Sequence, residues 1–211
     1  MAQREKIIKG YIEFELLNGR SPNSVFELTK KLKFEESDFY TYFGSLDALR
    51  SAIVAEFMVK TTALLDEDPN YDAFSAREKL LALFFTLFEQ FGTQRSYLLA
   101  RYSELKKAPE TSKDWKKFMT LLSERANLIL SEAKMQEEIK DRPLIGQHYA
   151  KGIPVVFTYL FRVWLNDDSE GLATTDAAIE KSVNLSFDML GSSPLDSLID
   201  FGKFALKTKV F

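Results

Sequence analysis

Side chains that commonly carry out catalysis or bind metals are scarce in this sequence. The chain has no cysteine and a single histidine, His148, which rules out thiol chemistry, disulfides and a zinc site built from several imidazoles. The Asp, Glu and Tyr residues follow no motif that would bring together a nucleophile, a base and a group that orients the base. We therefore expect a protein that is not an enzyme and that has no metal or other cofactor.

Aromatic side chains point to binding instead of catalysis. Residues 80–102 and 149–164 carry more apolar and aromatic side chains than one buried stripe of a helix requires. Such segments either form plain core or line a cavity, and both alternatives stay open. No cluster of Arg or His stands out as an anion site, so a ligand would be lipid-like or aromatic. The candidate pocket residues are Phe84, Phe88, Phe91, Tyr102, Phe118, Tyr149, Phe157 and Phe161.

Helices must position these side chains, because apolar residues recur at helical spacing and no segment alternates as a strand would. Short segments that contain glycine and proline separate the apolar stretches. The fold class is therefore predicted to be all-α. The expected helices cover residues 4–17, 25–32, 36–43, 45–66, 75–92, 95–107, 112–139, 144–166, 173–190 and 194–208.

The acidic segment 66–70, which contains Pro69, is the expected domain boundary. It separates a head, residues 1–66, from a larger helical domain, residues 67–211. The N-terminus is charged from Arg4 to Lys9 and does not resemble a signal peptide. The longest apolar stretch is too short to span a bilayer. We therefore expect a cytoplasmic protein.

Residues 24–49, SVFELTKKLKFEESDFYTYFGSLDAL, resemble the helix-turn-helix of TetR-family regulators. The most specific part is the run Phe39-Tyr40-x-Tyr42-Phe43 on the recognition helix, in which Phe39 and Phe43 should be core. The resemblance implies a three-helix head that a long fourth helix joins to a C-terminal bundle for ligand binding and dimerisation. It places the candidate DNA contacts at Ser24, Glu36, Ser37, Asp38, Tyr40, Thr41 and Tyr42.

The same segment departs from the family's usual pattern in its charges. Acidic residues stand at Glu35, Glu36 and Asp38, and Leu46 replaces a usual lysine. A carboxylate about 6 Å from a phosphate costs roughly 0.7 kcal/mol at the dielectric constant of water and nearly 3 kcal/mol at an effective value near 20. Acidic residues at the start of a helix also stabilise it through its dipole, and both effects can operate together. We predict that the head binds DNA weakly.

A second resemblance covers residues 159–181. Tyr159-Leu160, the run from Trp164 to Gly171, Thr174-Thr175 and residues 179–181 are similar to the ubiquinone-biosynthesis lipid-binding accessory proteins. Those proteins have a TetR-like fold, bind lipid and do not act through operators. A polar loop between two helices explains the same residues, so both interpretations stay open.

The TetR-like architecture implies a homodimer through the helices at 144–166 and 173–190. The helix at 194–208 is amphipathic; packing on the bundle is the favoured interpretation and binding to a membrane surface the alternative. The candidate dimer residues are Val155, Tyr159, Arg162, Val163, Ile179, Val183, Phe187 and Leu190.

Two functional hypotheses follow. The first is a ligand-responsive transcriptional regulator that senses an apolar or lipid-like molecule and moves its recognition helices on DNA. The second is a lipid-binding or carrier protein on the same scaffold that does not bind DNA. The first is favoured because the helix-turn-helix resemblance is longer. No motif in the sequence identifies the ligand, the operator or the regulated pathway.

Overall fold

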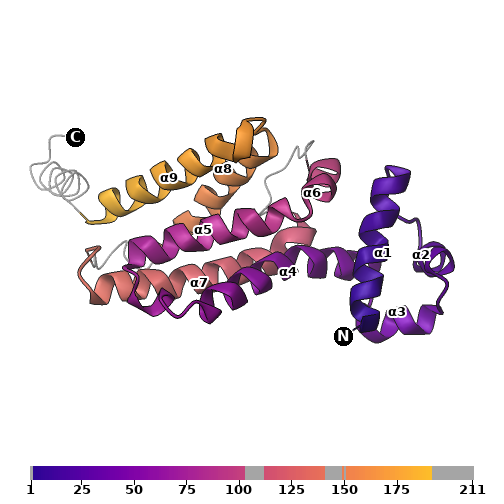
Figure 1. Ribbon diagram of the computed structural model, residues 1–211. Coiled ribbons are helices and arrows are strands. Elements are labelled where there is room, and N and C mark those ends of the chain that lie inside the picture. The colour runs from indigo at the N-terminus through magenta and orange to yellow at the C-terminus, as the bar shows by residue number, and fades with distance from the viewer. Residues whose placement is uncertain (1, 103–111, 141–148, 150, 192–211) are drawn as a thin grey trace, which may run out of the picture.

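The computed structural model describes residues 2–102, 112–140, 149 and 151–191, and these residues form helices and loops without a strand. The prediction of an all-α fold is confirmed. Figure 1 shows a small head at one end of an elongated body. The head contains α1 (Ala2–Asn18), α2 (Val25–Leu32) and α3 (Glu36–Tyr42), and α4 (Leu46–Glu67) runs from the head into the body.

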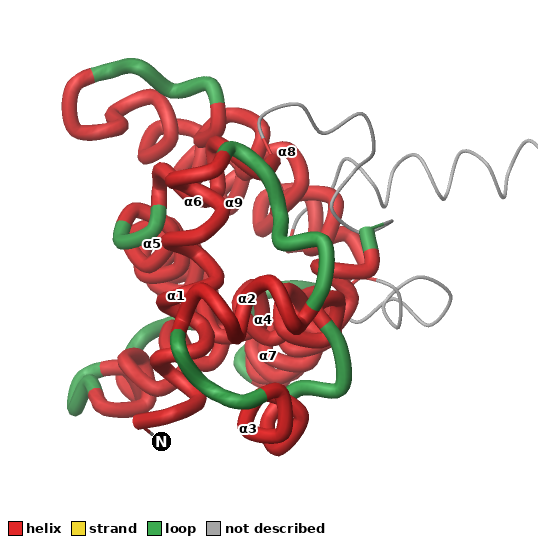
Figure 2. The backbone as a smooth tube through the Cα atoms, turned by 90° about the vertical axis from the view of Figure 1, so that its right-hand side faces the viewer, coloured by secondary structure: helices red, strands yellow, loops and turns green. Residues whose placement is uncertain are grey.

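The body is a bundle of helices around α5. Helix α4 packs against both α5 and α7, while α9 packs against α5 and α8. Figure 2, viewed from the head end, shows α1 to α3 in front of these helices. The body helices are α5 (Ala76–Gly92), α6 (Arg95–Tyr102), α7 (Lys116–Met135), α8 (Ile153–Leu165) and α9 (Ala173–Gly191), with short 3-10 turns η1 (Tyr71–Ala73), η3 (Lys113–Trp115) and η5 (Glu170–Leu172).

Two helices differ from their predicted bounds for local reasons. Of the helix expected over 144–166, α8 covers Ile153–Leu165, and Pro154, which lacks an N–H, is suited to its first turn. Residues 144–148 and 150 lie outside the described residues. The helix expected over 112–139 begins as η3 and ends at Met135, shortly before Glu137 takes a left-handed backbone with φ 59°. The end of the helix expected at 95–107 and the whole of that at 194–208 lie outside the described residues. No described helix is both long and apolar enough to cross a membrane.

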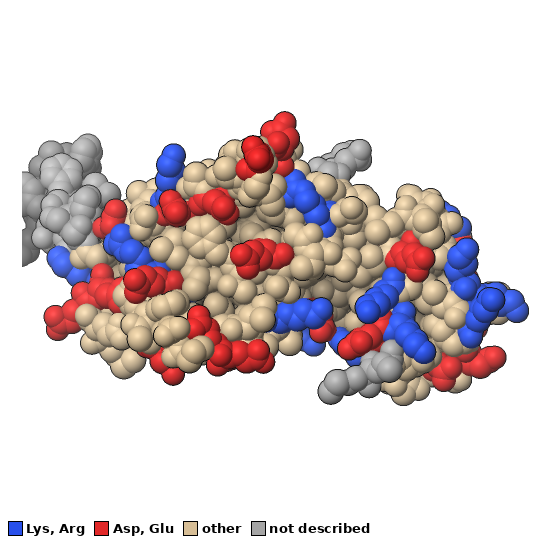
Figure 3. All heavy atoms as spheres, viewed as in Figure 1, with Lys and Arg blue, Asp and Glu red and all other residues tan. Residues whose placement is uncertain are grey.

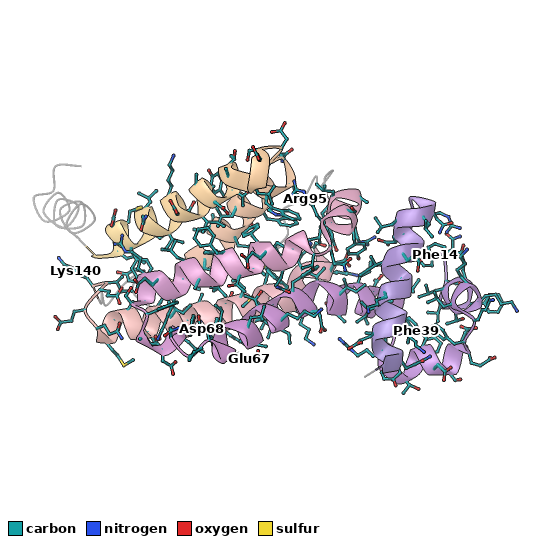
Figure 4. The ribbon with its side chains drawn as sticks, in the orientation of Figure 1. Phe14, Phe39, Glu67, Asp68, Arg95 and Lys140 are labelled. Carbon is teal, nitrogen blue, oxygen red and sulfur yellow. The ribbon has the colours of Figure 1, made fainter. Side chains whose placement is uncertain are left out.

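The head has its own apolar core, which α1, α2 and α3 share. Tyr11, Leu28 and Phe39 are fully buried, and Phe14 and Phe39 lie inside the head in Figure 4. Gly10 lets α2 approach α1 closely, because a Cβ at this position would lie 2.4 Å from a methyl carbon of Leu32. The close packing of these helices fixes where the exposed side of α3 points.

Candidate functional site

The α2–α3 segment forms a helix-turn-helix. The Ser24 hydroxyl accepts a hydrogen bond from the Glu27 N–H at 3.1 Å and so caps the start of α2. Helix α2 ends at Leu32, and the next residue, Lys33, has a left-handed backbone with φ 58° and ψ 49°. Glu35 precedes α3 in an extended conformation and makes no capping hydrogen bond. The left-handed backbone of Lys33 therefore sets the turn between α2 and α3, while Ser24 fixes where α2 begins.

One side of α3 packs on the head and the other faces outward. Phe39 and Phe43 are buried, so their assignment to the core is confirmed. Tyr40 and Tyr42 are 52% and 41% exposed and can reach a partner. Among the candidate DNA residues Glu36 is half-buried, and the exposed ones are Ser24, Ser37, Asp38, Tyr40, Thr41 and Tyr42. Contact between these residues and DNA stays a prediction.

Positive charge in this part of the head lies beside α3 and not on it. Glu36 and Asp38 occupy the first turn of α3, and the helix contains no Lys or Arg. Exposed Lys30, Lys31 and Lys33 lie at the end of α2 and in the turn. Figure 3 shows basic side chains over the outer end of the head. The first 50 residues carry eight basic and eight acidic side chains, and this balance concealed the cationic edge, which a phosphate backbone could contact.

A network of charged side chains joins the head to the body. Arg101 on α6 donates to Glu15 of α1 at 2.8 Å and to the hydroxyl of Ser21 at 3.0 Å. The same guanidinium donates to Asp114 of η3 at 3.1 Å. Tyr11 donates its hydroxyl proton to Glu15 at 2.5 Å. One arginine therefore connects α6, η3 and the head.

Asp114, which this network reaches through Arg101, also accepts hydrogen bonds from two other side chains. Arg50 of α4 donates to Asp114 at 3.3 Å, and the Tyr102 hydroxyl donates to it at 3.1 Å. Burial and the charge of Asp114 raise the pKa of Tyr102. Burial by itself lowers the pKa of Arg101, but Tyr102 and Glu15 outweigh burial and raise it. Arg101 therefore stays charged and Tyr102 stays protonated at neutral pH.

The aromatic candidates for a pocket are packed against one another in the body. The ring centroids of Phe118 and Phe157 lie 4.9 Å apart, and those of Phe91 and Phe161 lie 5.5 Å apart. Trp115 fills the space beside them, with its centroid 4.7 Å from that of Phe161. The buried candidates are Phe84, Phe88, Phe91, Tyr102, Phe118, Phe157 and Phe161.

Of the two alternatives for these residues, this packing favours plain core. Rings from α5, α7, α8 and η3 fill the space by packing edge to face and by stacking. Contact between these residues and a ligand stays a prediction. Tyr149 is not part of this cluster. Its hydroxyl donates to the carbonyl of Lys140, and its ring lies 5.6 Å from the ammonium of Lys134, near the other end of α7.

The exposed apolar face of α8 and α9 contains two of the predicted dimer residues, Val155 and Tyr159, and excludes three others. Ile179, Val183 and Phe187 are buried within their own bundle, so a partner cannot reach them. Val163 and Leu190 are half-buried, and Arg162 is exposed. The large exposed apolar side chains on these helices are Val155 and Tyr159 on α8 and Leu185 and Met189 on α9.

Asp167 organises the loop that carried the second resemblance. One carboxylate oxygen accepts from the N–H and hydroxyl of Ser169 at 3.0 and 2.6 Å, and the other accepts from those of Thr175 at 2.7 and 2.6 Å. Arg95, labelled in Figure 4, donates to the backbone carbonyl of Asp167 at 2.8 Å and lies over the ring of Trp164. These contacts explain the polar residues of this loop by their role in forming the turn between α8 and α9.

Comparison with known proteins agrees with this architecture. Residues 79–205, more than half of the chain, match the model of the tetracyclin repressor-like C-terminal domain. The chain belongs to the TetR family. Its fold is similar to that of a TetR-family transcription regulator from Marinobacter aquaeolei VT8, with a TM-score of 0.51, 18% identity and coverage of 90% of this chain and 96% of that one.

A second solved structure that matches the chain is the reduced form of Escherichia coli NemR. The TM-score is 0.49 at 17% identity, and the match covers 90% of this chain and all of the other. No curated protein matches the sequence significantly. At 18% identity the Marinobacter structure shows that the fold is similar and does not assign a ligand or an operator to this chain.

Proposed function

We propose that this chain is a TetR-family transcriptional regulator that binds DNA weakly and responds to an apolar or lipid-like small molecule. The observation that carries this proposal is the Arg101 network, which joins a helix-turn-helix with an exposed α3 to the aromatic core of the body. A regulator needs such a connection, because an effector acts only through contacts that differ between two states of the protein.

Residues that are adjacent in sequence link the aromatic core to the Arg101 network, and this explains how the core would act on the head. Tyr102 and Trp115 pack together in the core with centroids 5.3 Å apart. Their neighbours in sequence, Arg101 and Asp114, hold the head in place. A ligand that separates the two rings would therefore displace Arg101 or Asp114 and change the position of α1.

A homodimer through α8 and α9 completes this proposal. Two recognition helices about 34 to 36 Å apart can contact successive turns of DNA, whereas one helix contacts a single half-site. The apolar side chains exposed on α8 and α9 would be removed from water in such a dimer. The relative angle of the two heads would then depend on the body of each protomer.

The acidic first turn of α3 favours a second candidate, a lipid-binding protein that does not act through an operator. Glu36 and Asp38 lie where a phosphate would approach α3, and no cation on that helix offsets them. The two candidates share the ligand and differ only in whether DNA is bound.

Fluorescence polarisation with random and operator-enriched duplexes distinguishes them. The test variant carries Glu35→Ser, Glu36→Lys and Asp38→Thr, which remove three negative charges and add one positive charge per head. Leu46 is left unchanged because it is half-buried against the core. The control variant makes the same three types of change at exposed positions away from α3, as Glu67→Ser, Glu89→Lys and Asp176→Thr.

We expect the test variant to bind random duplex more tightly at low salt than the wild type and the control. Each added phosphate contact should steepen the slope of log affinity against log salt by about 0.9. If the control gains as much affinity as the test variant, the acidic residues of α3 do not face DNA. Duplexes selected from a random pool by the wild type would support the regulator, and failure to select any would favour the second candidate.

A further inference from the structure

An apolar groove of about 290 Å³ lies between α4 and α7. Buried Met58 of α4 and half-buried Leu121 of α7 form part of its lining. Val59 of α4 and Leu128 of α7 also line it and are 50% and 61% exposed, so no described residue covers them. Apolar side chains that gather in one groove at the surface are typical of a contact site.

The groove continues toward the end of α7 as a second hollow of about 350 Å³. The two hollows share Arg125 and Leu128, and Leu65 of α4 adds apolar surface to the second. Along α7 the lining runs from Leu121 to Glu132, a length of about 16 Å at 1.5 Å per residue. A groove of this length between two helices suits the apolar side of one more helix.

The described part of α9 ends at Gly191, near one end of this groove. A Cβ at Gly191 would lie 3.0 Å from the backbone oxygen of Glu138, which follows α7. The Glu138 carboxylate accepts from the N–H of Ala76 at 2.8 Å, where α5 begins after the η1 turn that borders the second hollow. In Figure 1, α4, α7 and α9 all end at the end of the body that is remote from the head. The chain therefore leaves the described part of the structure beside the groove.

Residues 194–208, which follow, have the sequence of an amphipathic helix. At helical spacing the apolar residues form one stripe and the Asp and Lys residues lie on another side. A helix of this length spans about 22 Å, enough to cover the groove. The apolar stripe consists of Leu195, Leu198, Ile199 and Leu206.

We propose that residues 194–208 bind in the groove between α4 and α7 of the same chain, with their apolar stripe against Val59 and Leu128. Binding would remove the apolar side chains of both partners from water. Because the segment begins near Glu138, it would run along α7 toward the head. This proposal concerns the body of one protomer and does not rest on the proposed function.

Thiol labelling of the full chain measures whether the groove is covered. The sequence has no cysteine, so an introduced thiol is the only one that reacts. Val59→Cys and Leu128→Cys place a thiol in the groove, and Leu64→Cys and Asn127→Cys place one at exposed positions of the same helices that do not line it. We expect a maleimide to react with the groove thiols at least about tenfold more slowly than with the controls, because a bound segment must first detach.

A substitution in the segment tests whether the segment is the cover. Leu198→Asp puts a charge on the apolar stripe, so it should raise the labelling rate of the Leu128→Cys protein to that of the Asn127→Cys protein. Ser197→Asp adds the same charge on the opposite side of the predicted helix and is the matched control. It should leave the labelling slow.

Disulfide formation identifies the chain that supplies the segment. Leu128→Cys is combined in turn with Leu195→Cys, Leu198→Cys and Ile199→Cys, and at least one pair should bring the Cβ atoms within about 4 Å and oxidise. Asn127→Cys with the same three partners is the control and should oxidise much more slowly. Non-reducing electrophoresis and peptide mapping should show a disulfide within one chain.

The proposal is overturned if the groove thiols react as fast as the controls, if Leu198→Asp leaves the labelling slow, or if the disulfide joins two chains. The first outcome would leave the groove open to solvent, and the last would assign it to a second copy of the chain. None of these measurements depends on DNA or on a ligand of the aromatic core, so the test succeeds or fails separately from that of the proposed function.

Discussion

Lys33 has a backbone conformation that favours glycine. Its φ of 58° lies in the left-handed region, where a Cβ approaches the following carbonyl oxygen. We expect Lys33→Gly to raise the free energy of unfolding by about 1 kcal/mol and the melting temperature by roughly 2–4 °C. Lys30→Gly, within helix α2, is the matched control and should lower the melting temperature. A lower melting temperature for Lys33→Gly would show that the turn does not depend on this conformation.

Asp167 makes stability depend on pH through its hydrogen bonds. Burial alone raises the pKa of Asp167, but the hydrogen bonds from Ser169 and Thr175 outweigh burial and hold the pKa well below its usual range. A carboxyl group with a lowered pKa in the folded state stabilises the protein above its unfolded pKa of about 3.9, and this contribution is lost as the pH falls through the folded value.

Asp167→Asn should therefore be less stable than the wild type at neutral pH, and the difference should shrink as the pH falls below about 4. Urea unfolding at several pH values measures this difference. Asp168→Asn, at the exposed neighbouring position, should show no such trend. A difference that stays constant down to the lowest pH would mean that the charge of Asp167 does not contribute.

At the scale of the helix, α9 shows why the dimer face could not be assigned from sequence. Two apolar sets run along this helix, one containing Ile179, Val183 and Phe187 and the other containing Leu185 and Met189. Helical spacing alone does not decide which set faces the bundle. Packing against neighbouring helices decides which set is buried. In one such contact, the guanidinium of Arg77 on α5 lies 5.4 Å from the centre of the Phe187 ring.

The exposed set gives a sharper test of the homodimer than Phe187, whose substitution would disrupt the core. Leu185→Glu would place a carboxylate in the proposed interface, where its desolvation costs several kcal/mol, so sedimentation should show a monomer. Leu128→Glu on α7 is the control, since both leucines are 61% exposed. If both variants sediment as the wild type does, α8 and α9 do not form the interface.

At the scale of the molecule, the order of the helices and the core positions of the head were predictable, because apolar periodicity and turn residues are local signals. Contacts between distant segments were not. Glu15 and Arg101 are 86 residues apart in sequence, and only the docking of α1 beside α6 brings them together. The tight packing of the aromatic residues could not be predicted from the sequence either. Composition indicates how much apolar area is buried and not whether that area encloses a cavity.

If Arg101 connects the body to the head, its effect on stability should depend on Glu15. The Arg101 and Glu15 side chains are 20% and 7% exposed, so removing one partner leaves the other charge largely buried. In a double-mutant cycle with Arg101→Gln and Glu15→Gln, measured by urea unfolding, we expect a coupling energy of about 1–3 kcal/mol. The exposed pair Arg20–Glu27, within the head, is the control and should couple by less than about 1 kcal/mol. Effects of Arg101 and Glu15 that simply add would mean that the head is held by other contacts, and the proposed route from the aromatic core to α1 would lose its basis.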